Sequence, residues 1–229
     1  MTVKNKLATR RRCFLLELAG LVLMVGLTAS AQTTPDPWLI LLGSEDSAFT
    51  AHTTREDLVR RYGAANVSDR DIDIGEGETE PGTVVFSSDP QRTIEILWKD
   101  SGAKRAPKQV QIQGQVSLWK SAHGISLGTS LKELEHINGG LFLLFGFNWD
   151  YSGTVTSWKG GTLEKELPGT TEKEPQGNGR VILRLDTPPG ANLAESESAE
   201  VAGDREFSSQ HPVMQKINPR VYQIIWQFP

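Results

Sequence analysis

The stretch LGTSLKELEHINGGLFLLFGFNWDYSGTVTSW, residues 127–158, predicts one complete structural unit of this chain. Ser130 and Glu133 have the spacing of a capping box, in which the hydroxyl accepts from a backbone N–H three residues on and the carboxylate reaches back, so a helix is expected to begin there. The following pair of glycines ends that helix, because glycine adopts the left-handed conformation without a Cβ clash. An apolar run and a β-branched run, residues 141–147 and 154–158, then predict a β-hairpin.

An upstream segment repeats this pattern. Thr54 and Asp57 have the same cap spacing, and a hairpin is expected over residues 83–98. Each segment is followed by one more alternating strand, at residues 109–118 and 181–185. The pattern indicates an internal duplication; the alternative is chance, since capped helices and hairpins are common. Leu58 and Gly63 then correspond to Leu134 and Gly139, and Trp98 to Trp158, with both tryptophans expected in the core.

The fold class predicted from these units is α+β. Two related helix-plus-antiparallel-meander halves, residues 32–120 and 121–229, are expected to share a mostly antiparallel sheet. Residues 37–42 are a short strand candidate, and alternating apolar residues at the C-terminus predict a final strand in the main sheet. The second half also holds long acidic loops, residues 159–180 and 186–206, whose composition favours disorder over functional covers.

The N-terminus has the pattern of a secretory signal peptide over residues 1–31. Three arginines precede an apolar run, residues 14–29, and Ala29-Ser30-Ala31 is a small-residue cleavage site. The run is shorter than the roughly 20 apolar residues of a membrane span, so we expect no permanent span after cleavage. The segment Arg11-Arg12-Cys13-Phe14-Leu15 also resembles a twin-arginine export signal, and ordinary secretion is the alternative. The predicted location is periplasmic or secreted.

Charge and cysteine content exclude several kinds of function. Removing residues 1–31 takes away five of 24 basic and one of 28 acidic residues, leaving 19 against 27, a net charge of −8. We expect no nucleic-acid partner, because such a chain repels a polyanion and no basic stripe is present. The one cysteine, Cys13, lies in the predicted signal, so the mature chain would have no disulfide and no cysteine metal site.

The acidic segment 69–80 offers two interpretations. Its six carboxylates lie at alternating positions that resemble a calcium loop, which would make this a calcium-stabilised structural protein. However, Ile74 stands where the helix-loop-helix calcium loop needs glycine, and Gly75 comes one position late. We therefore favour a solvated acidic loop or irregular strand and predict no metal site. The six are Asp69, Asp71, Asp73, Glu76, Glu78 and Glu80.

No recognisable catalytic or cofactor motif is present. The four histidines, His52, His123, His136 and His211, lack the spacing of a zinc site. A hydrolase with a dispersed site, such as Asp150 with His123 or Glu76 with Glu78, is the enzymatic alternative. We predict no catalytic residue and no cofactor.

The strongest candidate for partner binding is the cluster Trp149, Asp150 and Tyr151 at the expected hairpin tip. Aromatic side chains beside a carboxylate can stack on a sugar or anchor a protein, because they offer a large area with few rotatable bonds. The alternative role is structural, with the aromatic residues fixing the turn onto the core.

The capped helix followed by an antiparallel meander, over residues 54–98 and 127–158, resembles the repeated module of β-lactamase-inhibitor-protein-like folds. That resemblance implies a non-enzymatic protein binder that uses the concave face of its sheet. The chain departs from that family by lacking its disulfides and lipoprotein cysteine and by adding two acidic loops. Residues 149–155 also resemble an uncharacterised group of secreted bacterial proteins. The function expected is a binding module for a protein or a cell-envelope glycan.

Overall fold

The structure is a computed structural model that describes residues 1–2, 36–42, 44–167 and 179–229. Contacts divide the chain into two units, Met1–Thr34 and Pro35–Pro229, and the fold described below is that of the second. Nearly all of the predicted signal peptide, residues 1–31, lies outside the described residues, as does part of the expected loop 159–180.

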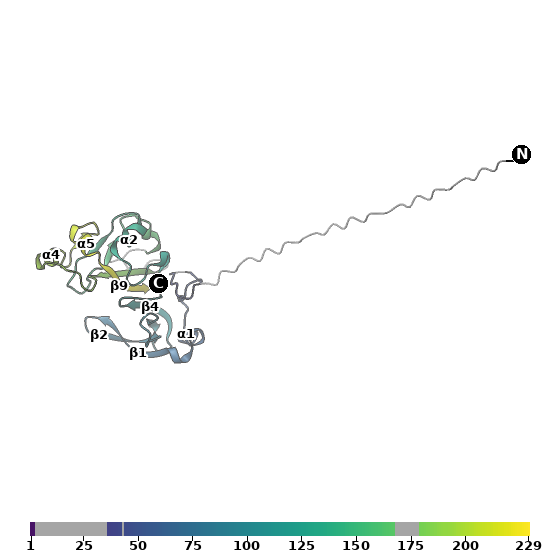
Figure 1. Cartoon of the computed structure of the whole chain (residues 1–229). Helices are drawn as coiled ribbons and strands as arrows, with labels where there is room; N and C mark the ends of the chain where they lie inside the picture. The colour runs from purple at the N-terminus through teal and green to yellow at the C-terminus, as the bar shows by residue number, and fades with distance from the viewer. Residues whose placement is uncertain (3–35, 43, 168–178) are drawn as a thin grey trace. The chain divides into compact units, whose positions relative to one another are not determined.

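The main element of the fold is a six-stranded sheet in the order β1-β2-β3-β4-β9-β7. All five of its strand pairings are antiparallel, and β4 and β9, its fourth and fifth strands, lie side by side (Figure 1). The strands come from both predicted halves, so the prediction of an α+β chain with a mostly antiparallel sheet is confirmed. The strand bounds are Val67–Gly75 for β1, Glu78–Val85 for β2, Ile94–Asp100 for β3, Arg105–Gln113 for β4, Arg180–Asp186 for β7 and Arg220–Gln227 for β9.

A second sheet of three short strands has the order β6-β5-β8. Its strands are β5 at Leu143–Phe145, β6 at Val155–Ser157 and β8 at Glu206–Ser208. The hairpin expected from the sequence is therefore present as β5 and β6, but it belongs to this smaller sheet. One antiparallel bridge, between Thr154 and Arg184, connects the end of β6 to β7.

Two eight-residue helices begin at the predicted capping boxes. Helix α1 spans Arg55–Tyr62 and helix α2 spans Leu131–Asn138, and in each the N-cap hydroxyl and the carboxylate three residues on bond as the box requires. The N-cap residues Thr54 and Ser130 also make equivalent bridges, to Arg105 at the start of β4 and to Arg220 at the start of β9. The remaining helices are η1 at Ala64–Asn66, η2 at Ala122–Gly124, α3 at Leu163–Glu166, α4 at Glu195–Glu200 and α5 at Pro212–Ile217.

One hydrophobic cluster joins both helices to one face of the main sheet. Leu58 of α1 and Leu134 of α2 are both buried in it, as are Trp98, Trp158 and Trp226. The prediction that Trp98 and Trp158 are core residues is confirmed. Their predicted correspondence does not follow from the strand order, because Trp98 lies in β3 of the main sheet and Trp158 follows β6 of the smaller one.

The acidic segment 69–80, predicted to be a solvated loop or an irregular strand, is a hairpin of β1 and β2 whose pairing is irregular between Asp73 and Gly75. Two other local predictions were wrong. Residues 37–42 form only a single bridge, from Leu39 to Lys120, and no strand. Residues 186–206 include α4 and the fully buried Val201, because the segment packs against Phe147 through backbone hydrogen bonds.

Candidate functional site

A groove of about 370 Å³ lies on the face of the main sheet that points away from the large core. Side chains alternate along a strand, so while Val110 and Ile112 of β4 enter the core, the glutamines beside them face the groove. Strand β9 contributes two more glutamines, and three apolar side chains lie between the amides. The glutamines are Gln109, Gln111, Gln113, Gln223 and Gln227, and the apolar residues are Leu97, Ile182 and Ile225.

A row of side-chain hydrogen bonds crosses this face from β7 to β3. Arg180 donates to Gln227, Gln227 donates to Gln109 at 3.4 Å, and Gln109 donates to Gln111 at 2.7 Å. Gln111 then donates to the Glu95 carboxylate at 2.8 Å. A glutamine amide carries two N–H donors and an oxygen with two lone pairs. These hydrogen bonds therefore orient each glutamine while using only part of its hydrogen-bonding capacity.

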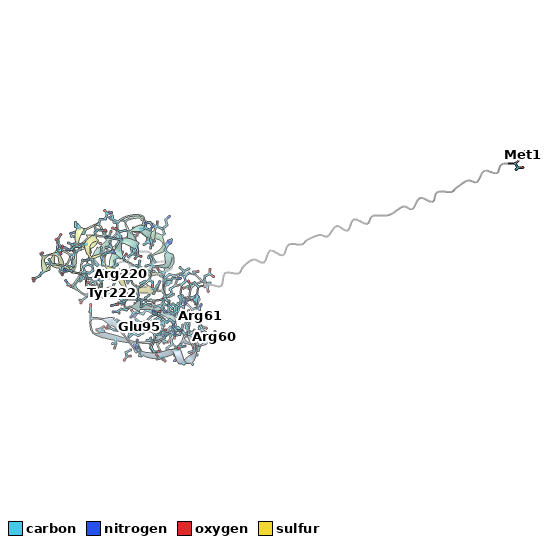
Figure 2. All side chains as sticks on the ribbon, in the orientation of Figure 1. Met1, Arg60, Arg61, Glu95, Arg220 and Tyr222 are labelled. Carbon is cyan, nitrogen blue, oxygen red and sulfur yellow. The ribbon has the colours of Figure 1, made fainter. Side chains whose placement is uncertain are left out.

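A second, shorter row lies nearer the start of β9. Arg184 donates through Nη1 to Gln223 at 3.2 Å, and Gln223 donates to Gln113 at 3.4 Å. The Nε atom of Arg184 is buried and has no hydrogen-bond partner among the residues that the structure describes. Glu95 and Tyr222, both labelled in Figure 2, come from β3 and β9, two of the strands that meet at this face.

Two exposed apolar side chains stand at the edges of the groove. Ile74, 45% exposed, lies at the tip of the β1–β2 hairpin, whose residues 73–75 line the groove. Tyr151, 48% exposed, lies at the tip of the β5–β6 hairpin and also lines it. The guanidinium of Arg184 lies 5.7 Å from the centre of the Tyr151 ring, within the range of a cation–π contact.

The three residues predicted for partner binding have different surroundings. Tyr151 lines the groove, whereas Trp149 is half-buried and packs edge-on against both Tyr151 and Phe145, at 5.3 and 5.1 Å between ring centres. The Trp149 indole N–H donates to the carbonyl of Gly146 at 3.0 Å, which anchors the turn. Asp150 is exposed and lies outside the set of residues that line the groove.

Sequence reasoning missed the glutamines. Their alternation with apolar residues in 109–113 predicted a two-faced strand, and the same alternation of Gln223 and Gln227 with Ile224 and Trp226 gives the final strand the same character. A cluster of one residue type on two neighbouring strands was the signal available, but the pairing of β4 with β9 was needed to bring them together.

The acidic hairpin already has basic partners. Asp69 contacts Arg55 at 3.0 Å and Lys104 at 2.8 Å, and Glu80 contacts Lys108 at 2.8 Å. Burial alone would raise the pKa of the Asp69 carboxyl, but hydrogen bonds from Lys104, Arg55 and Thr83 outweigh it and lower the pKa. Within the described ranges no group of three metal-ligating side chains converges.

The residues named for the enzymatic alternative are dispersed. Glu76 and Glu78 are exposed at the turn of the β1–β2 hairpin, and His123 is exposed in the loop before α2. His211 has a structural role, because its Nδ1 accepts the backbone N–H of Val213 at the start of α5.

Comparison with protein-family models, with curated proteins and with solved structures finds no significant match to this chain. Among the described residues, no helix has both the length and the apolar character needed to cross a membrane.

Proposed function

We propose that this protein is a non-catalytic binding module that holds an extended segment of a partner in the glutamine-lined groove. The observation that carries the proposal is the combination of oriented amides on the groove floor with two exposed apolar side chains, Ile74 and Tyr151, at its edges. Amides that keep spare donors and acceptors can bond to a polar backbone, and flanking apolar groups add contact area.

We also propose that the protein acts outside the cytoplasm, in the periplasm or as a secreted protein. The support is the N-terminal sequence: three arginines, an apolar run and a small-residue cleavage site within residues 1–31. An envelope or extracellular location would place the groove among protein and glycan partners.

An internal duplication is the third part of the proposal, and equivalent hydrogen bonds support it. Thr50 N–H donates to the Thr53 hydroxyl at 2.9 Å, and Ser126 N–H donates to the Thr129 hydroxyl at 3.1 Å. The first residue of each helix, Arg55 or Leu131, donates its N–H to the residue before β4 or β9, at 2.9 and 2.8 Å. The same spacing therefore gives the same local structure twice, and each copy docks its helix at the start of β4 or of its neighbour β9.

Site-specific photo-crosslinking tests the binding proposal. A crosslinking residue is placed at Ile74 or Tyr151, and, as a matched control, at Arg60, which is exposed on α1 away from the groove. After incubation with envelope extract, we expect adducts from positions 74 and 151 that excess unlabelled protein prevents, and none from position 60. Equal adduct formation at all three positions would contradict a dedicated binding groove.

A further inference from the structure

The charge inside the groove differs in sign from that of the whole chain. The chain carries a net charge of −4, yet the charged residues lining the groove are two acidic and three basic. Glu80 and Lys108 pair with each other at 2.8 Å, and Asp73 accepts the N–H of Gly75 within its own hairpin turn. Arg184 of β7 is a lining cation that takes part in neither of these contacts.

Arg184 has a donor that no contact within the described residues uses. Its Nη1 donates to Gln223 at 3.2 Å and its guanidinium also hydrogen-bonds to the Tyr222 hydroxyl, but its buried Nε has no partner in the described part of the chain. A guanidinium has five N–H donors in a planar fork that matches a carboxylate. A half-buried guanidinium whose Nε lacks a partner can still bind an anionic group.

The surroundings of Arg184 define the geometry of such a site. The centre of the Tyr151 ring lies 5.7 Å from the guanidinium. Tyr222 also lines the groove, and burial raises the pKa of its hydroxyl, which keeps it a proton donor. Gln223, which is buried, holds the Nη1 atom from the sheet side.

From these contacts we infer that the groove binds an acidic, extended polypeptide segment, with Arg184 receiving an Asp or Glu carboxylate. The inference rests on the proposed binding function and names its ligand. A polypeptide fits better than a glycan because apolar and polar side chains alternate along the groove: Ile225 lies between Gln223 and Gln227 on β9, and Ile182 lies between two arginines on β7. The exposed Tyr151 ring is already in contact with Trp149 edge-on and with the Arg184 guanidinium.

An array of synthetic nine-residue peptides, made in matched triplets with Glu, Gln or Lys at the central position, tests the inference. We expect the purified protein to bind Glu members about tenfold more than their Gln partners, which corresponds to about 1.4 kcal/mol. Lys members should bind more weakly than Gln members. In Arg184→Gln the ratio of Glu to Gln binding should fall to about one, while Arg60→Gln, which removes an exposed arginine on α1, should keep it.

Two further variants separate recognition from folding. Arg184→Lys retains the charge but loses the fork, so it should keep only part of the Glu preference. Tyr151→Leu should weaken binding to all members of a triplet while leaving most of the preference for Glu. A thermal melt of each variant, matching that of the unchanged protein, shows that the fold is retained.

The outcomes distinguish this inference from the proposed function. Equal binding of Glu and Gln members, or a Glu preference that survives in Arg184→Gln, overturns the inference even if crosslinking at positions 74 and 151 succeeds. Arg184-dependent binding to polygalacturonic acid, with no peptide bound, would instead assign the carboxylate to a glycan and overturn the polypeptide ligand. Failure of both the array and the crosslinking would overturn the proposed function as well.

Discussion

Replacing Gly153 by alanine is expected to be the most damaging single-methyl change in the β5–β6 hairpin. Gly153 has φ +62°, and a Cβ built on it would lie 1.8 Å from the carbonyl oxygen of Leu185 in β7. The Leu185 N–H donates to the Gly153 carbonyl at 2.9 Å, so two backbones touch at this point. The added methyl group must push the hairpin tip away from β7.

The magnitude follows from two separable costs. An alanine in the left-handed region costs about 1–2 kcal/mol. Separating the backbones then removes the hydrogen bond to Leu185 and the neighbouring Thr154–Arg184 bridge, at about 1 kcal/mol for each hydrogen bond lost. The total is about 3–4 kcal/mol, which for a chain of this size lowers the melting temperature by about 6–16 °C.

Thermal and urea unfolding of Gly153→Ala measure this loss, and Gly160→Ala is the matched control. Gly160 also has positive φ, +77°, but its Cβ would meet nothing within 4 Å. The control therefore carries only the left-handed cost of about 1–2 kcal/mol, and the difference between the variants reports the contact with β7. Equal losses in the two variants would show that Gly153 does not touch β7 as described.

Other predictions concern the capped helix, the buried tryptophans and the acidic hairpin. Ser130→Ala should cost about 1 kcal/mol in unfolding experiments, because it removes an N-cap hydroxyl. Hydrogen bonds from the backbone and hydroxyl of Ser130 lower the pKa of Glu133, so this cap stabilises the protein above the ordinary pKa of 4.5. The free energy of unfolding lost in Glu133→Gln should therefore shrink as pH falls below that value. A loss that is independent of pH would contradict this prediction. Trp158→Phe should lower the free energy of unfolding by about 1 kcal/mol more than Trp226→Phe. The reason is that the Trp158 indole N–H donates to a backbone carbonyl at 3.0 Å, whereas that of Trp226 has no partner in the described ranges. Equal losses in urea unfolding would refute this prediction. Calcium should not raise the melting temperature above that in chelator, because Asp69 is already paired with two cations, and a clear rise would revive the calcium alternative.

Short-range features of the fold could be predicted because their hydrogen bonds lie within a few residues. The capping boxes at Thr54 and Ser130 are satisfied by groups three residues on, so the pattern alone fixes both helix starts. The sheet that a strand joins depends instead on distant partners. Nothing in residues 141–158 indicates that β5 pairs with β8, whose residues lie about sixty positions further along the chain than those of β5.

The acidic hairpin shows why charge alone could not decide between a loop and a strand. Strand β1 is at the edge of the main sheet and pairs only with β2, so its exposed side chains can be charged without burying any charge. Charged residues on an edge strand also discourage pairing with another chain. Its one fully buried apolar residue after Val67 is Ile72, which packs with Val84 and Leu97 in a second small cluster. Two buried residues in nine, five positions apart, do not give the period of two that predicts a strand from sequence.

The groove could not be predicted because neither half contains it. Strand β4 supplies three glutamines and the first hairpin supplies Ile74, whereas β7, β9 and the second hairpin supply Arg184, two glutamines and Tyr151. The β4–β9 ladder sets Gln109 opposite Gln227 and Gln113 opposite Gln223, so the amide rows exist only where those strands pair. Under the proposed duplication, each copy docks its helix onto one of the adjacent strands β4 and β9 and contributes one edge of the groove. The two edges then differ chemically, because one has an isoleucine and the other has a tyrosine with an arginine. An elongated ligand would therefore bind in one direction only.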